Sequence, residues 1–163
     1  MTDFIGSGLP PDRPPASRPA VRYREDCGNA PRKRLLLDLA AAFAEGDLEP
    51  VTLRLHDGIV WKRAGRGTLE GKAAVVEALE GMKEEMMRLG VEELRVDYLL
   101  THGNEAAMNG LVVPGNHGPG SSGARHRSFC ALVRFAGHSR DARIRELTTY
   151  LVETEEEGGM EWA

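Results

Sequence analysis

Apolar residues recur at helical spacing near the start of the chain. Within residues 31–45 four of them follow the i, i+3, i+4, i+7 pattern of one helix face: Leu36, Leu39, Ala40 and Phe43. A proline at the start of this segment and a glycine directly after it mark the two ends of the predicted helix. A shorter helix is expected over residues 47–55, because Asp47 can cap its first turn. A third helix is predicted over residues 70–89, where a second apolar stripe ends before a glycine: Val75, Leu79, Met82, Met86 and Leu89.

The pattern changes from helical to alternating after Gly90. A strand is predicted with four residues on one buried face: Leu94, Val96, Tyr98 and Leu100. The hairpin signal Gly103-Asn104 follows it, and a partner strand is predicted over 105–113. A loop over 114–123 precedes a strand with an entirely apolar face: Phe129, Ala131, Val133 and Phe135. The last strand is expected over 142–154.

A brief strand at residues 59–61 separates the second and third predicted helices. The order is therefore helix, helix, strand, helix and four strands. Helices that are segregated from consecutive hairpin-connected strands predict an α+β domain, with a curved, mainly antiparallel sheet that closes on the helices.

The length of 163 residues fits one domain. Residues 1–25 are rich in proline and are expected to be a disordered leader, residues 26–154 to form the domain, and residues 155–163 to be an acidic tail. The net charge is −4, but five glutamates lie in the last eleven residues, which contain no lysine or arginine. The rest of the chain is therefore nearly neutral.

These features exclude several classes of partner and compartment. The dispersed basic residues do not form the clustered face that nucleic acid requires. No window approaches the length of a membrane span, and the first twenty residues lack the apolar core of a secretory signal. Cys27 and Cys130 are accordingly expected to be free thiols in the cytoplasm.

Four phrases in this order of elements resemble the SnoaL-like branch of the nuclear transport factor 2-like superfamily, over about residues 26–154. They are CGNAPRKRLLLDLAAAFAEGD, HDGIVWKRAGRGTLEGK, THGNEAAMNG, and RSFCALVRF followed by IRELTTYLVE. The resemblance implies a cone-shaped α+β fold in which three N-terminal helices pack on a strongly curved sheet and leave a pocket. It also implies a homodimer joined through the outer face of the sheet.

The superfamily includes a steroid isomerase, a polyketide cyclase, a limonene epoxide hydrolase, a scytalone dehydratase and non-catalytic binding proteins, so the fold alone does not settle the function. Two positions depart from its catalytic members. Ala131 and Val152 stand where those members commonly carry carboxylates. Because an apolar side chain cannot activate water or abstract a proton, the specific reactions of these relatives are disfavoured.

Four aromatic residues on predicted strands are candidates for the wall of a pocket: Trp61, Tyr98, Phe129 and Tyr150. Trp61 matches the tryptophan of the family's "DIVW" phrase, and core packing is its alternative role. A buried Tyr98 would need a partner for its hydroxyl group, either in the protein or in a ligand.

Glu146 and Asp97 are the weak candidates for a catalytic acid or base, and no catalytic residue is assigned. Glu146 would have a raised pKa if it faced inward, whereas Arg134 lies across the same predicted hairpin and could pair with it on the outside. The second interpretation is favoured because buried unpaired acids are rare. Both faces of the last strand are mixed, so alternation does not identify the inner one.

No metal site and no cofactor are expected. The five histidines have no metal-ligand spacing, and Gly118–Gly123 match GxGxxG but precede a strand instead of a helix. The leading hypothesis is a cytoplasmic protein that binds a small, mostly apolar molecule, with catalysis left open. The alternatives are a lyase, isomerase or hydrolase that uses general acid/base chemistry, and a dimeric interaction module.

Overall fold

A computed structural model describes residues 19–23, 31–115 and 125–154. The helices are α1 (Pro31–Glu45), α2 (Glu49–Leu53) and α3 (Lys72–Leu89). The strands are β1 (Ala20–Tyr23), β2 (Leu55–Arg63), β3 (Gly67–Glu70), β4 (Val91–His102), β5 (Glu105–Pro114), β6 (His126–Phe135) and β7 (Ile144–Thr154). They form one sheet in the order β1-β4-β5-β6-β7-β2-β3.

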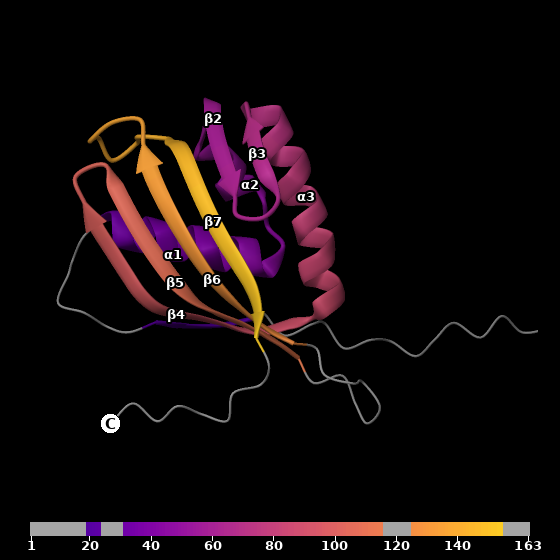
Figure 1. The fold of residues 1–163 in the computed structure, drawn as a ribbon. Coiled ribbons are helices and arrows are strands. Elements are labelled where there is room, and N and C mark those ends of the chain that lie inside the picture. Colours follow the sequence, from indigo (N-terminus) through magenta and orange to yellow (C-terminus); the bar gives the residue numbers. More distant parts are fainter. Residues whose placement is uncertain (1–18, 24–30, 116–124, 155–163) are drawn as a thin grey trace, which may run out of the picture.

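The two long helices form where the apolar stripes predict them. Helix α1 buries Leu36 and Leu39, and α3 buries Val75, Leu79 and Met86. Gly90 ends α3 in the left-handed conformation, and its N–H donates to the carbonyl oxygens of the last turn. In Figure 1, α1 crosses behind β4 to β7, while α3 flanks the sheet beside β2 and β3. The helices therefore cover one face of the curved sheet, as predicted for an α+β cone.

The last four strands form the predicted meander. Neighbouring strands from β4 to β7 pair antiparallel, and Gly103 adopts a positive φ of 57° at the β4–β5 turn. Strand β2 extends well beyond the predicted residues 59–61 and pairs parallel with β7. The prediction missed β3, which pairs antiparallel with β2 after the tight turn at residues 64–66.

One strand lies within the segment that was predicted to be disordered. Ala20–Tyr23 form β1 and pair parallel with β4, so the prediction for residues 1–25 is wrong at these four positions. Backbone pairing with β4 provides stabilisation that composition alone does not reveal. Residues 1–18, Cys27, most of the predicted loop over 114–123 and the acidic tail lie outside the described residues.

A bulge at Asp97 reverses the two faces of β4. Val96 pairs with Gly110 and Tyr98 with Asn109, so Asp97 is an extra residue in β4. Before the bulge Val96 is buried, with 2% of its surface exposed, whereas after it Tyr98 is 53% exposed. The expectation that Tyr98 and Leu100 share the buried face of Val96 is therefore wrong, because the extra residue shifts the alternation by one.

A second register shift explains the mixed faces of β7. Phe135 pairs with Ile144 but Arg134 pairs with Glu146, which makes Arg145 the extra residue. Ile144 is buried on the helix-covered face, and Glu146 lies on the opposite one. The strand thus changes faces at Arg145, and no single alternation could have described it.

The core consists of two clusters of buried side chains. The larger lies between the helices, β2 and the adjacent ends of β5, β6 and β7, and it contains Leu36, Ile59, Trp61, Val75 and Phe135 among others. The smaller joins Ala44, Met86, Val91, Leu94 and Val112. Phe43 packs against both. No helix in the described ranges has the length and apolarity needed to cross a membrane.

Candidate functional site

The sheet presents two different faces. We call the one covered by the helices the inner face, and the opposite one the outer face. Cross-strand partners point to the same face, so the register assigns each residue. Both faces carry features that are relevant to binding.

Four residues cross the inner face in one row: Met108 on β5, Ala131 on β6, Thr149 on β7 and Arg63 on β2. We call this row the inner strip. None of the four belongs to either core cluster or packs against one as a partly buried hydrophobic residue. Ala131 is buried, but the other three are only half-buried although they lie on the covered face. Beside the strip, Leu151 is 41% exposed.

Trp61 anchors one end of the inner strip. Its indole ring is 2% exposed, and its Nε1 donates a hydrogen bond of 2.9 Å to the Thr149 hydroxyl. The guanidinium carbon of Arg63 lies 5.5 Å from the centroid of the same ring. The hydrogen bond joins β2 to β7 and fixes the orientation of both side chains.

Arg63 brings a positive charge to this face. Its Nε is buried and has no hydrogen-bond partner, while Nη2 donates to the carbonyl oxygen of Arg66 at 3.5 Å. Within the described ranges no carboxylate pairs with it. A buried donor without a partner is costly, which makes Arg63 a candidate for contact with a polar group of a ligand.

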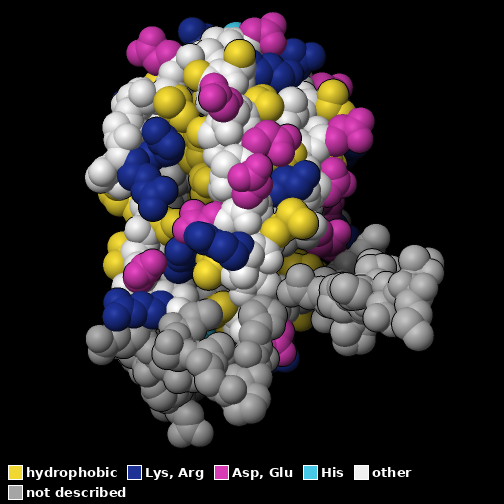
Figure 2. Space-filling view, turned by 90° about the vertical axis from the view of Figure 1, so that its right-hand side faces the viewer, with side chains coloured by type: hydrophobic (Ala, Val, Ile, Leu, Met, Phe, Trp, Pro, Cys, Tyr) yellow, Lys and Arg dark blue, Asp and Glu magenta, His cyan; other side chains and the backbone are white. Residues whose placement is uncertain are grey.

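Ion pairs link α3 to β6 and β7 near the start of β6. Arg127 donates to Glu85 Oε1 at 2.8 Å and to Glu153 Oε1 at 3.4 Å. The Arg127 side chain is 13% exposed and that of Glu85 is 26% exposed. These carboxylates lie on the inner side of the sheet, but each is already engaged by the guanidinium group. Figure 2 views the side of the molecule that carries α3, where basic and acidic side chains are interspersed.

The outer face carries a set of exposed apolar side chains. We define the outer patch as Tyr98, Leu100, Leu132, Tyr150 and Val152, which are between 44% and 62% exposed. Tyr98, Leu100, Tyr150 and Val152 lie around an open hollow of about 410 Å³, which Cys130 also lines, whereas Leu132 on β6 lines a neighbouring hollow together with Leu100. Asn109 Oδ1 lies in this region, buried and without a hydrogen-bond partner. Contiguous exposed apolar surface of this kind marks interaction sites.

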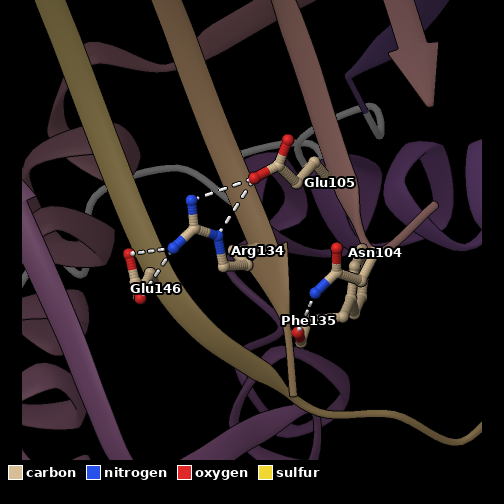
Figure 3. Close-up of polar contacts among 5 residues, drawn as sticks. All are labelled: Asn104, Glu105, Arg134, Phe135 and Glu146. Atoms are coloured by element: carbon tan, nitrogen blue, oxygen red, sulfur yellow. Dashed lines mark hydrogen bonds and ion pairs between the residues drawn. The ribbon is translucent and has the colours of Figure 1, made fainter. Parts of the chain in front are cut away.

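A charged cluster borders the outer patch at one end. Figure 3 shows Arg134 between two glutamates on neighbouring strands: its Nη2 lies 2.9 Å from Glu105 Oε1 and its Nη1 3.2 Å from Glu146 Oε1. The hydrogen bond that Arg134 donates to Glu105 and the negative charges of both glutamates raise the pKa of Arg134 above its usual value. Nearby, Asn104 Nδ2 donates to the Phe135 carbonyl oxygen at 3.3 Å and fixes the adjacent turn.

The four predicted pocket residues do not surround one space. Tyr98, Phe129 and Tyr150 border the outer hollow, whereas Trp61 lies on the inner face in the larger core cluster. Phe129 also packs against the smaller cluster from the inner side. The bulge at Asp97 moves Tyr98 to the opposite face from Trp61, and the extra residue Arg145 does the same for Tyr150.

The two candidate acids both lie in exposed ion pairs. Glu146 pairs with Arg134 as the favoured interpretation predicted, and Asp97 Oδ1 accepts a hydrogen bond of 2.9 Å from Arg95 Nε. Their side chains are 43% and 39% exposed. Among the described residues neither carboxylate has a hydrogen bond to Tyr98 or to a histidine. The arrangement does not create the acid or base pair that catalysis by these two residues would need.

No role was predicted from the sequence for Arg63, Thr149 or Arg127. Position 63 could have been noticed, because Ile59, Trp61 and Arg63 alternate on one face of β2 once that strand is extended.

Within the described part of the chain, no group of three or more histidine, cysteine, aspartate or glutamate side chains could hold a metal ion.

The sequence and the fold both match known proteins. The family model of the SnoaL-like domain matches residues 36–147, and no curated protein matches the chain. An NTF2-like protein of unknown function from Cytophaga hutchinsonii is 23% identical, with a TM-score of 0.57 over 74% of this chain and 98% of its own. A SnoaL-like protein of unknown function from Burkholderia thailandensis is 16% identical, with a TM-score of 0.58 over 78% and 99% of the two chains.

A de novo designed protein with a curved β-sheet has the same architecture. It is 14% identical, with a TM-score of 0.55 over 75% of this chain and 85% of its own. At these identities the similarity shows the fold alone. Because a designed chain shares this backbone, the function must be argued from the side chains of the two faces.

Proposed function

Because this chain belongs to the family of the SnoaL-like domain, we propose that it binds a small, mostly apolar molecule on the inner strip of its sheet. The molecule would lie between the two core clusters, against Met108, Ala131 and Thr149. Trp61 would form the floor of this site through its hydrogen bond to Thr149. Sites for small molecules are typically apolar with a few polar groups that fix the orientation, and the inner strip has this composition.

The observation that carries the proposal is the interruption of the core. Side chains on a face covered by helices are normally packed, yet Met108, Thr149 and Arg63 stay half-buried, and the hydrophobic Met108 belongs to neither cluster. The buried Arg63 Nε without a partner lies in the same interval. An apolar occupant would replace water there and give Arg63 and Thr149 a polar partner.

Trp61 provides a direct test. In a Trp162→Phe background it is the only tryptophan, because the chain has two. Titration with camphor, a compact apolar probe with one carbonyl group, is expected to change the Trp61 emission in a saturable way. Absence of a saturable change, together with no rise in melting temperature, would contradict the proposal.

Two neighbouring residues locate the bound probe. Ala131→Leu adds bulk to the inner strip and should abolish the camphor response, whereas Leu132→Ala removes an outer side chain and should leave it unchanged. Circular dichroism checks that both variants fold. If Ala131→Leu does not fold, Thr149→Val in the same strip replaces it, with an expected weakening of several-fold because a polar partner for the carbonyl group of camphor is lost. An effect of Leu132→Ala alone would place the site on the outer face and refute the inner one.

A second candidate function is self-association through the outer patch. The five exposed apolar side chains favour it, because a folded chain rarely leaves so much contiguous apolar surface to water. The patch lies on a sheet face and is bordered by charges of both signs, with Arg134 beside Glu105 and Glu146. A two-fold axis could therefore place the apolar rows of two copies against each other, with the charges at the rim.

Light scattering coupled to size exclusion tests self-association. We expect the mass of a dimer for the unmodified chain and that of a monomer for Leu132→Glu, which introduces a charge into the apolar row that borders Arg134. Lys62→Glu, an exposed change on β2 outside the patch, is the control and should remain dimeric. A monomeric unmodified chain at high micromolar concentration would exclude this candidate.

General acid/base catalysis receives no comparable support. Asp97 and Glu146 are held in exposed ion pairs, so no observation favours a lyase, isomerase or hydrolase reaction by these residues. A cytoplasmic location remains a prediction from the sequence.

A further inference from the structure

One end of the molecule gathers arginines from three separate segments of the chain. An open hollow of about 610 Å³ is lined by the start of α1, the α2–β2 junction, the end of β4 and the β6–β7 loop. Four arginines and one histidine line it, against a single aspartate: Arg32, Arg34, Arg54, Arg140, His138 and Asp141. This concentration of charge contrasts with the mixed surface shown in Figure 2.

The pairing of these arginines is incomplete. Arg34 pairs with Asp38 at 3.2 Å. Arg54 Nη1 donates one hydrogen bond of 3.4 Å, to the carbonyl oxygen of Arg140. The Arg140 side chain makes no hydrogen bond or ion pair within the described residues. Two guanidinium groups therefore face one hollow without a carboxylate partner.

Arg32 has a different role at the base of the hollow. Its Nη1 donates to the carbonyl oxygen of Gly103, and its Nη2 donates to those of Gly137 at 2.8 Å and Ser139 at 3.4 Å. The guanidinium group also lies 4.7 Å from the centre of the Phe135 ring. These contacts hold its positive charge in place, half-buried and without a carboxylate partner in the described ranges.

We propose that this hollow, which we call the basic hollow, binds a small multivalent oxyanion such as a diphosphate or a polycarboxylate. Arg32 supplies a fixed charge, and Arg54 and Arg140 supply guanidinium forks that can each bond two oxygens. Like charges held close together repel, so an anion in the hollow would also relieve this repulsion. Asp141 neutralises one charge at most. The site is distinct from the inner strip, and binding at either one does not require the other.

Calorimetric titration with inorganic diphosphate and, separately, with citrate tests the proposal at constant ionic strength. Saturable binding of at least one anion is expected, and the better of the two identifies phosphate or carboxylate as the preferred group. Arg140→Ala should weaken binding about tenfold, because one charge-assisted contact is lost. Its side chain makes no hydrogen bond or ion pair among the described residues, so folding should be preserved.

Arg145→Ala is the matched control. Arg145 is exposed on β7, makes no hydrogen bond or ion pair among the described residues and does not line the basic hollow. The control should bind the anion within about twofold of the unmodified chain, since only general screening is changed. Arg54→Lys provides a second test, because it keeps the charge but loses the fork and should bind more weakly.

The proposal is overturned if neither anion binds saturably at millimolar concentration. It is also overturned if Arg145→Ala weakens binding as much as Arg140→Ala, because the attraction would then be general and not local.

Discussion

Gly110 permits the close approach of two strands at the bulge. A Cβ atom at this position would lie 1.8 Å from the carbonyl oxygen of Arg95 and 3.0 Å from Cε1 of Phe129. The first of these neighbours is backbone, so it cannot move without disturbing β4. The absence of a side chain at position 110 therefore allows β4 to bend at Asp97 and turn Tyr98 outward.

Gly110→Ala is accordingly expected to lower the free energy of unfolding by about 3 kcal/mol or to prevent folding. Gly81→Ala is the matched control, because Gly81 lies inside α3 and an added Cβ would meet nothing within 4 Å. It should raise stability by about 0.5–1 kcal/mol. Urea unfolding measures both, and a tolerated Gly110→Ala would contradict the close approach.

Arg63 determines which polar group a ligand on the inner strip should carry. If its unpartnered Nε faces the ligand, decanoate should bind about tenfold more tightly than decanol, because a charge-assisted hydrogen bond is added. Arg63→Met keeps the apolar length of the side chain and should remove the difference. Trp61 emission reports both titrations. Equal binding of the two probes by the unmodified chain would exclude this role for Arg63.

The long elements follow from the sequence, whereas the short ones do not. Helices α1 and α3 each bury a continuous stripe, so the apolar period and the terminal glycines predict them closely. Strands β1 and β3 have four residues each, and they are formed by pairing with a neighbour instead of by a pattern of their own. Their existence depends on the tertiary structure.

Bulges limit how well the alternation of residues along a strand predicts the sheet face on which a candidate site residue lies. Asp97 and Arg145 each insert one residue without a local mark, and every side chain beyond them changes face. For this reason the sequence correctly predicted the strand containing Tyr98 but not the side on which its ring lies. Gly110 in the partner strand β5 is the sequence feature that could have indicated the bulge in β4.

Arg32 joins three elements at one end of the molecule. From α1 it donates to carbonyl groups in the β4–β5 turn and the β6–β7 loop. Arg32→Lys keeps the charge but cannot reach all three acceptors, and we expect a loss of about 2 kcal/mol in the free energy of unfolding.

Arg34→Lys, in the same turn of α1, serves as the control for Arg32→Lys. Arg34 is 73% exposed and has one ion pair, so its replacement should change stability by less than about 0.5 kcal/mol. Equal effects of the two substitutions in urea unfolding would show that Arg32 does not hold these loops.

At the level of the whole molecule, the near neutrality predicted from the composition conceals an uneven distribution of charge. Arg32, Arg54 and Arg140 are far apart in the sequence, and the fold alone brings them to one hollow. Basic residues that are dispersed along the sequence are therefore gathered at this end of the structure.

Self-association would also make stability depend on concentration. If two copies cover the outer patch, the melting temperature should rise with protein concentration, because mass action favours the dimer. Leu132→Glu should abolish this dependence without lowering the melting temperature of the dilute protein by more than a few degrees. A melting temperature that stays constant over a hundredfold range would argue against a dimer of this kind.

The most direct test of binding on the inner strip is a titration of the ¹³C-methyl methionine signals with camphor. Met108 lies in the strip, whereas Met87 on α3 is 64% exposed. Because Met108 also lines the outer hollow, Ala131→Leu serves as the control and should abolish the response of Met108. We expect a saturable shift of the Met108 signal and none of the Met87 signal. An unchanged Met108 signal at saturating camphor, or a Met108 shift that persists in Ala131→Leu, would contradict binding on the inner strip.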